Sequence, residues 1–332
     1  MENANPVDAV ITWVDGNDPA HRARRRQFAR PEELSNDSIA GDTRYTSIGE
    51  INYCVASILR FAPWIRNVFI VTDKQDPKLE EYVEKHFPGR SRDLHIVDHS
   101  VVFRGMEEAL PVFNSLSIES VLWRIPGLAE RYIYFNDDCS LSAPVTPEDF
   151  YADNGLVCYG SRFSLKLVKL LRELKHLRPG PKVFGFKDAL AESADAINRY
   201  EEGGKKKFNH IVLCGHTPHP QLRSLLEGFF TDHPDALKSN AFHRFREPSQ
   251  FNPQELCYLL AEARGMLSLR PLKGEALYLK PKNKEGYVAG KIAGFESNPK
   301  ARFCCLNSID CASKEDQELI ISWLKRRIGL QD

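Results

Sequence analysis

Apolar residues occur along the chain in short continuous runs separated by segments of helical periodicity. The runs are rich in Val, Ile, Phe and Tyr, as is typical of buried strands. They cover residues 8–14, 67–73, 93–99 and 131–138. The segments between them place apolar residues three and four positions apart, which predicts helices. These helical segments cover residues 47–63, 78–87 and 115–125. Strands that alternate with helices predict an α/β fold with a mostly parallel, Rossmann-like sheet flanked by helices.

The pattern changes after residue 150, and we divide the chain there. Residues 1–150 are expected to form an α/β core, 151–210 a basic helical insertion or lid, and 211–332 the part that completes the core. Later helices are predicted at 218–230, 253–267 and 313–329, with a loop at 233–251 and a strand and turn at 301–311.

The insertion contains a helix with two contrasting faces, within residues 165–182. Leucines form one face and basic residues the other. The leucines are Leu167, Leu170, Leu171, Leu174 and Leu177, and the basic residues are Lys166, Lys169, Arg172, Lys175 and Arg178. Two interpretations stay open: a docked surface helix with a solvated basic face, or a lid or edge that meets an anionic, lipid-linked polymer.

Acidic residues end three of the predicted strands, at Asp15, Asp73 and Asp138. In parallel sheets, ligands bind outside the carboxyl ends of the strands. Asn136, Asp137 and Asp138 follow the strand at 131–138 and resemble the short acidic motif that holds Mg²⁺ or Mn²⁺ against a diphosphate. The same residues also suit an ordinary turn, so both interpretations remain open at this point.

Histidines and arginines supply further candidates in the last third of the chain. His216 and His219 are flanked by prolines, which favours a rigid loop able to hold an imidazole as a proton acceptor, or a pair of structural histidines. His243, Arg244 and Arg246 alternate with aromatic residues. Two arginines spaced two apart could face the same way and bind phosphate.

Charge and cysteine content narrow the class of protein. The 45 basic and 45 acidic side chains cancel, so nucleic-acid binding is not expected. The N-terminus has no leader pattern and no window is apolar enough to span a membrane, which predicts a cytoplasmic protein with reduced cysteines. Cys304, Cys305 and Cys311 lack the usual spacing of zinc ligands.

Several segments, in this order, resemble the conserved regions of the Stealth family. They are DAVITWVDGNDP (8–19), RYTSIGEINYCVASILRFAPWIRNVFIVTD (44–73), LPVFNSLSIESVLWRIPGLAERYIYFNDD (110–138), HTPHPQLRSLLEGFF (216–230) with FHRFREP (242–248), and RFCCLNSIDC (302–311). That family includes bacterial capsule-polysaccharide sugar-1-phosphate transferases and the eukaryotic N-acetylglucosamine-1-phosphotransferase that marks lysosomal enzymes.

The resemblance implies a GT-A-like sheet and a phosphotransferase reaction. A hexose- or N-acetylhexosamine-1-phosphate would pass from a UDP-sugar to a hydroxyl of a capsular or exopolysaccharide chain, and UMP would leave. The implied cofactor is Mg²⁺ or Mn²⁺, and the implied partners are the UDP-sugar donor and a polysaccharide acceptor, free or lipid-linked, with peripheral contact at the inner membrane. A conventional glycosyltransferase that releases UDP and a non-catalytic nucleotide-sugar or polysaccharide-binding protein remain as alternatives.

The resemblance also assigns roles to individual residues. Asp137 and Asp138 would be catalytic metal ligands, His216 the general base and Arg246 the clamp on the transferring phosphate. The donor would contact Thr12, Trp13, Val14, Asp15, Gly16, Asn17, Arg44, Arg66, Asn114, Ser115 and Asn136. Glu119, His219, His243 and Asn307 are further candidates. One departure is Leu306-Asn307-Ser308, where the family commonly has Leu-Asn-Asp; Asp310 could replace that carboxylate.

Overall fold

The computed structural model describes residues 5–29, 48–153, 155–177, 184–200, 207–282 and 284–330. Arg44, one of the expected donor contacts, lies outside these residues.

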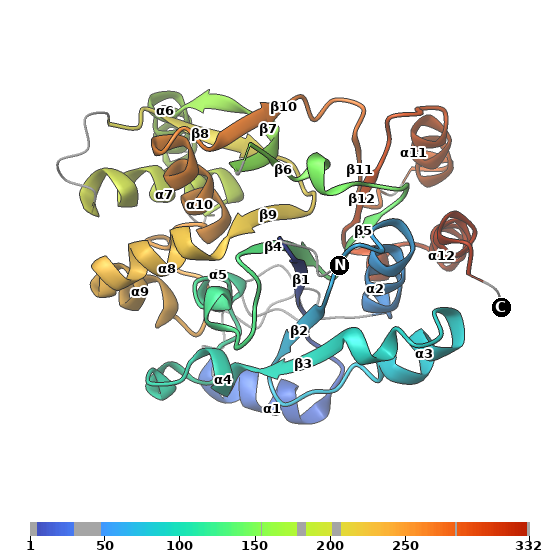
Figure 1. Cartoon of the computed structure of the whole chain (residues 1–332). Coiled ribbons are helices and arrows are strands. Elements are labelled where there is room, and N and C mark those ends of the chain that lie inside the picture. Colours follow the sequence, from blue (N-terminus) through green and yellow to red (C-terminus); the bar gives the residue numbers. More distant parts are fainter. Residues whose placement is uncertain are drawn as a thin grey trace.

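The strands form a five-stranded sheet and smaller ones. Their bounds are β1 (Val7–Thr12), β2 (Val68–Thr72), β3 (Leu94–Asp98), β4 (Arg131–Asn136), β5 (Cys139–Leu141), β6 (Tyr151–Ala152), β7 (Gly155–Ser164), β8 (His210–Cys214), β9 (His219–Leu222), β10 (Leu267–Arg270), β11 (Ala276–Leu279) and β12 (Phe303–Leu306). The large sheet has the order β3-β2-β1-β4-β9. Figure 1 shows β1, β2 and β4 near the centre of the molecule, with helices on either side and β7, β8 and β10 at the upper edge. Its first four strands are parallel and only β9 is antiparallel, which confirms the predicted mostly parallel α/β sheet.

The helices cover both the large sheet and the smaller ones. Their bounds are α1 (Pro19–Phe28), α2 (Glu50–Phe61), α3 (Leu79–His86), α4 (His99–Val102), α5 (Ser115–Glu119), α6 (Leu165–His176), α7 (Phe186–Tyr200), α8 (Arg223–Asp232), α9 (Pro234–Ala241), α10 (Pro253–Ala263), α11 (Tyr287–Glu296) and α12 (Lys314–Ile328). Helix α2 begins after Gly49, whose φ of 94° is a left-handed conformation that glycine adopts without steric cost. Among the described residues, none of these helices combines the length and the apolar character needed to span a membrane.

The strand order creates a switch point between β1 and β4. The chain runs from β1 outward through β2 and β3, then returns to place β4 on the other side of β1. Strands β1 and β4 are parallel, with Thr12 opposite Asn136 at their carboxyl ends. Ligands of open α/β sheets bind at such a switch point, so the topology brings the first strand end and the acidic turn to one place.

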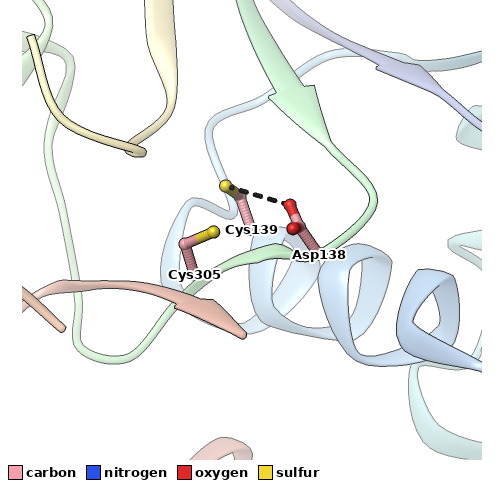
Figure 2. A group of neighbouring side chains, drawn as sticks. All are labelled: Asp138, Cys139 and Cys305. Atoms are coloured by element: carbon pink, nitrogen blue, oxygen red, sulfur yellow. Dashed lines mark hydrogen bonds between the residues drawn. The ribbon is translucent and has the colours of Figure 1, made fainter. Parts of the chain in front are cut away.

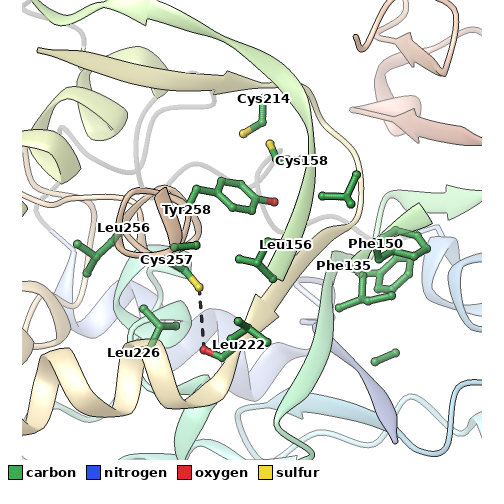
Figure 3. Close-up of a cluster of buried hydrophobic side chains, with 14 of the residues drawn as sticks. Phe135, Phe150, Leu156, Cys158, Cys214, Leu222, Leu226, Leu256, Cys257 and Tyr258 are labelled. Atoms are coloured by element: carbon green, nitrogen blue, oxygen red, sulfur yellow. Dashed lines mark hydrogen bonds between the residues drawn. The ribbon is translucent and has the colours of Figure 1, made fainter. Parts of the chain in front are cut away.

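Two smaller groups of strands extend the large sheet. Strand β5 leaves the acidic turn and pairs with β12, which also pairs with β11. Strand β7 pairs with β6, β8 and β10. One buried apolar cluster reaches from Val7 through Leu156 to Phe303. Figure 3 shows part of it, where Phe135 of β4, Leu156 of β7 and Tyr258 of α10 lie in the same core. The core therefore includes residues from all three predicted segments, while the proposed division itself stays a prediction.

Three local predictions were wrong. Residues 219–222, expected in a helix, form β9 because they pair with β4. The expected loop at 233–251 contains α9, which begins at Pro234. The helix expected at 115–125 is interrupted after Glu119, and a 3-10 turn follows at Leu122–Arg124. Strand β9 is a case in which tertiary pairing overrides a local pattern, whereas α9 begins with a proline at its first position, which is a local helix-start signal.

The docked-helix interpretation of α6, in which the leucine face is buried and the basic face is solvated, is also wrong. Its buried residues are Leu165 and Val168, while the leucine face at 167–177 is exposed. Two of its basic residues point inward instead and pair with acids of α7: Lys169 with Asp195 at 2.7 Å, and Arg172 with Glu192 at 2.9 Å.

Candidate active site

A cavity of about 560 Å³ lies at the carboxyl ends of β1 and β4. The structure brings most of the predicted site residues to it. Those that line it are Thr12, Trp13, Val14, Asn114, Ser115, Asn136, Asp137, Asp138, His216, Arg246 and Asn307. Residues far apart in the sequence therefore converge on one volume of a size usual for small-ligand sites.

The first wall of the cavity is the paired end of β1 and β4. The Tyr134 hydroxyl lies 3.0 Å from Thr12 Oγ1, 2.8 Å from Asn136 Oδ1 and 3.1 Å from Glu119 Oε1. Burial raises the pKa of Glu119, and nearby Arg246 opposes that change. This buried group of hydrogen bonds fixes the two strand ends and helix α5 relative to each other, so it orients the acidic turn that follows.

The acidic turn concentrates negative charge at the cavity. Burial raises the pKa of Asp137 well above its usual range, and the carboxylates of Asp138 and Glu50 raise it further. The other carboxylate is held by neutral groups: Asp138 Oδ2 accepts from Asn307 Nδ2 at 3.1 Å. Carboxylate and amide oxygens are the donors that Mg²⁺ prefers. A divalent cation would offset the repulsion at Asp137, so these residues fit the expected ion.

His216 lies across the cavity, in the bend between β8 and β9. Its ring stacks on Tyr278 with centroids 4.8 Å apart, and Phe186 lies 5.7 Å away. Burial by these neighbours lowers the pKa of His216 below its usual 6.5, while Asp138 acts in the opposite direction. The imidazole is consequently neutral at physiological pH, as a proton acceptor must be.

Arg246 reaches the cavity from the loop after α9. Its Nη2 donates to Ser115 Oγ at 2.8 Å. The loop itself is fixed by buried Gln250 and Asn114, whose side chains are 2.7 Å apart, and by the bond from Asn114 Nδ2 to Phe245 O at 3.0 Å. The expected pairing of two arginines is wrong, because Arg244 turns away and lies over the Phe28 ring at 4.8 Å.

Some predicted donor contacts lie elsewhere. Arg66 forms a bidentate pair with buried Asp8 at the start of β1, at 2.9 and 2.6 Å, which is the end opposite the cavity. Asp15, Gly16 and Asn17 continue into the turn before α1, outside the cavity lining, and Asp15 Oδ1 accepts from Asn17 N at 2.8 Å.

Two further histidine candidates also lie outside the cavity lining. His219 is buried in β9, where its Nδ1 is 3.0 Å from the Tyr258 hydroxyl, and burial lowers its pKa to about 3. His243 Nε2 donates to Ser239 O at 2.9 Å, on α9. Both histidines therefore make structural hydrogen bonds. For His219 this is the structural alternative left open for the pair at 216 and 219, whereas His216 lines the cavity.

Other cavity residues were missed by sequence reasoning. Lys280 adds a cation at the carboxyl end of β11. Asp310, by contrast, was expected from the sequence as a replacement for the carboxylate absent at Ser308, and it lines the same region. His21 and His99 are buried in the lining, and burial lowers the pKa of each to about 4. A lone Lys or His carries no sequence signal of its own, and only the fold brings these to the site.

A group of thiols lies behind the acidic turn (Figure 2). Cys139 and Cys305 are directly opposite each other in the β5–β12 pair, and with Asp138 they place three ligand atoms within 4.8 Å of one another. Cys139 Sγ donates to Asp138 Oδ1 at 3.6 Å. Contact with Cys139 and burial raise the pKa of Cys305. Asp138 is thus bordered by oxygen and nitrogen groups on one side and protonated thiols on the other.

Similarities to known proteins agree with the resemblance seen in the sequence. The model of Stealth protein conserved region 1 matches residues 5–30, and that of conserved region 2 matches residues 44–159. The exopolysaccharide phosphotransferase SCO6021 of Streptomyces coelicolor is 47% identical over 256 residues, which are 75% of this chain and 42% of that protein. Two further relatives align over more of their length. The receptor polysaccharide phosphotransferase WefC of Streptococcus oralis and the capsular polysaccharide phosphotransferase WcwK of Streptococcus pneumoniae are each 32% identical over 268 residues, 75% of this chain and 76% of theirs.

Solved structures show only a distant likeness. The galactosyltransferase LgtC, in complex with donor and acceptor sugar analogues, gives a TM-score of 0.45 at 10% identity and covers 97% of this chain and 95% of its own. Mouse xyloside xylosyltransferase 1 gives 0.37 at 11% identity, covering 91% and 98%. These scores are too low to support a conclusion, so the fold rests on the strand order itself. The matched conserved regions and the relatives aligned over three quarters of their length show that the chain belongs to the Stealth family.

Proposed function

We propose that this protein transfers a sugar 1-phosphate from a UDP-sugar to a hydroxyl of a capsular or exopolysaccharide acceptor. The observation that carries the proposal is the meeting of Asp137 and Asp138, His216 and Arg246 around one cavity at the sheet's switch point. The relatives named as polysaccharide phosphotransferases support the same reaction class. Phosphoryl transfer depends on positioning and charge neutralisation, and these are the groups that provide both.

The reaction is a substitution at the β-phosphorus of the donor. The acceptor oxygen forms a bond to that phosphorus, and the bond from the phosphorus to the bridging oxygen between the two phosphates breaks. UMP leaves with the bonding electrons, while the sugar's anomeric bond remains intact. The product is a phosphodiester between the sugar and the acceptor.

His216 is positioned to take the proton of the attacking hydroxyl. Its lowered pKa keeps the imidazole neutral, and its stacking on Tyr278 limits the ring to one plane. Removal of a well-placed general base typically slows a reaction by about 10²- to 10⁴-fold. His216 is the one predicted histidine that lines the cavity among those the structure describes.

Arg246 and a cation held by the acidic turn would each neutralise part of the negative charge on the donor's diphosphate. Arg246 is held by Ser115 and can present its planar guanidinium to phosphate oxygens. Mg²⁺ or Mn²⁺, held by Asp137 and Asp138, would neutralise the diphosphate. Lys280 is a further cation on the same cavity.

A conventional glycosyltransferase would use the same donor but release UDP. The purified protein should therefore be incubated with a set of UDP-sugars, Mg²⁺ and an oligosaccharide primer, and the nucleotide product separated by chromatography. UMP formed in proportion to extended primer is the expected result. UDP as the main nucleotide product would favour the glycosyltransferase and refute the proposal, and donor binding without turnover of any sugar would favour a binding protein.

Matched variants test the residue assignments in the same assay. His216→Ala and Arg246→Ala should each lower UMP release by about 100-fold or more. Arg244→Ala is the control for the arginine, since Arg244 lies over Phe28, and His243→Ala is the control for the histidine, since His243 contacts α9. Equal losses in a variant and its control would refute the assignment.

A further inference from the structure

Helix α6 presents a continuous leucine surface to solvent. The exposed fractions are 41% for Leu167, 48% for Leu170, 49% for Leu171, 50% for Leu174 and 80% for Leu177. Their spacing of three and four places them on one face of the helix. We call these five residues the leucine surface. Contiguous exposed apolar patches of this kind mark interaction sites more often than inert surface.

The orientation of α6 is fixed by its inner face. Leu165 and Val168 are buried against the protein. The ion pairs Lys169–Asp195 and Arg172–Glu192, at 2.7 and 2.9 Å, attach the helix to α7. Rotation of the leucines inward would break these pairs and expose Leu165, so the structure holds the leucine surface outward.

Basic residues accompany the leucine surface. Lys166 and Lys175 are exposed on α6, and Glu173 is the exposed acid of the same helix. Exposed Lys207 lies close to the helix start, because Leu165 N donates to Asn209 O at 2.9 Å. An apolar face bordered by lysines matches a surface that is apolar inside and negatively charged outside.

The leucine surface also lies near the cavity. The ion pairs join an early residue of α6 to a late one of α7 and a later residue of α6 to an earlier one of α7, so the two helices are antiparallel. The C-terminal end of α6 therefore approaches the N-terminal end of α7. That end is Phe186, which contacts the His216 ring.

We propose that the leucine surface docks on an anionic lipid bilayer, with α6 lying in the plane of the membrane surface. The leucines would enter the acyl boundary and the lysines would meet the lipid headgroups. A second copy of the chain is a poorer fit, because one short helix offers less than the roughly 800 Å² per partner of a stable interface and would bring the lysines of both copies together. This inference goes beyond the proposed reaction and does not depend on it.

Vesicle binding by the full chain tests the proposal. The protein should co-sediment with vesicles of phosphatidylcholine and phosphatidylglycerol, and far less with phosphatidylcholine alone. The double variant Leu171→Glu with Leu174→Glu should lose at least about tenfold in affinity. Leu319→Glu is the matched control, because Leu319 is a 38% exposed leucine on α12, and it should bind as the unaltered protein does.

Charge reversal, salt and sedimentation velocity separate lipid binding from self-association and from misfolding. Lys166→Glu with Lys175→Glu should weaken binding to the mixed vesicles, and raised salt should do the same. The leucine variants should retain a normal circular dichroism spectrum. The proposal is overturned if the unaltered protein stays in the supernatant with both vesicle types, or if the leucine variant and Leu319→Glu bind equally. It is also overturned if sedimentation velocity shows that the leucines hold two copies together and vesicles are not bound.

Discussion

Asp137 and Asp138 follow β4 directly, at the point where β1 ends beside it. Burial, and after it the neighbouring carboxylates of Asp138 and Glu50, disfavour the ionisation of Asp137 and raise its pKa. This arrangement is unfavourable in the absence of a cation and favourable in its presence. The repulsion between the carboxylates is thus consistent with a site that binds a cation together with a diphosphate.

The pH dependence of turnover should report His216. Because burial lowers its pKa below 6.5, the imidazole stays neutral until the pH falls below that value. The acid limb of kcat/KM should therefore lie below pH 6.5, with activity lost as the pH falls through the lowered pKa. A series of initial rates at saturating Mg²⁺ would measure it. An acid limb at neutral pH or above would contradict the assignment of His216 as base.

Asp137→Asn should stabilise the metal-free protein while removing activity. The raised pKa means that the folded state holds the Asp137 proton to higher pH than the unfolded chain does. Ionisation of Asp137 therefore costs the folded state no stability below a pH of about 3.8, and the loss of stability grows as the pH rises above that value towards the raised pKa. At pH 7 the variant should gain about 1 kcal/mol in urea unfolding without Mg²⁺.

The same experiment with Mg²⁺ provides the control for Asp137. Added Mg²⁺ should stabilise the unaltered protein but have a much smaller effect on Asp137→Asn. Cys305→Ser should respond to Mg²⁺ as the unaltered protein does, if oxygen atoms alone hold the ion. If Asp137→Asn is less stable than the unaltered protein at pH 7 without metal, the account of charge repulsion is wrong.

Among individual site residues, those at the ends of predicted strands could be recognised from the sequence, whereas isolated residues could not. Asp73, Asp137 and Asp138 could be predicted because apolar runs end at or next to them, and all three line the cavity. Thr12 was assigned through the family resemblance. Lys280 and His99 could not, since nothing near them in the sequence signals a site. Arg66 was assigned to the donor by the family resemblance, but in the structure it pairs with Asp8 at the start of β1. The sequence does not show this contact, because the two residues are far apart along the chain.

At the scale of elements, the loop carrying Arg246 depends on a buried polar group. Gln250 is fully buried and lies 2.7 Å from Asn114 Nδ2 and 2.9 Å from Glu247 N. Gln250 also donates to Asn240 O at 2.7 Å. These bonds tie the loop to α5 and α9, so they set the position of Arg246 without touching the cavity.

Gln250→Ala should therefore reduce both stability and activity. Leaving several buried partners unsatisfied is expected to cost about 2 kcal/mol in the free energy of unfolding, and UMP release should fall because Arg246 is no longer positioned. Urea unfolding and the turnover assay measure the two effects. Arg246→Ala is the comparison, since it should remove activity with little loss of stability. A Gln250→Ala protein with full activity would show that the network does not position Arg246.

Helix α6 shows that residue spacing can predict an apolar helix face without predicting whether that face is buried or exposed. The leucine spacing correctly gave one apolar face, yet the acids of α7 attract Lys169 and Arg172 inward. The sequence contains both patterns, but their pairing depends on the hairpin formed by α6 and α7. Strand β9 was missed for a similar reason, because its pairing with β4 outweighs the helical pattern around it.

At the scale of the whole molecule, the apolar core joins parts far apart in the sequence. Phe303 of β12 is fully buried and packs against Phe150 and Tyr159, with ring centroids 5.9 and 5.1 Å away. Balanced charge gives the molecule no general attraction for anions, so its recognition must come from local groups. The core shared by distant segments favours a single cooperative unit.

Phe303→Ala tests this cooperation. The substitution should lower the free energy of unfolding by about 3–5 kcal/mol, and urea unfolding followed by tryptophan fluorescence and by circular dichroism should give coincident transitions. The exposed Phe28→Ala change on α1 is a suitable control, with a much smaller effect. Two separate transitions, of which only one responds to Phe303→Ala, would show that the chain contains independently folding parts.

The fate of the donor's β-phosphorus distinguishes transfer of a sugar 1-phosphate from transfer of the sugar alone. A UDP-sugar labelled with ³²P at the β-phosphate should be incubated with the protein, Mg²⁺ and an oligosaccharide primer, and the label followed into nucleotide and primer. We expect the label to enter the primer while unlabelled UMP is released, and Arg246→Ala to lower this transfer by about 100-fold or more. Label that remains in UDP while the primer gains the sugar would contradict the proposed reaction.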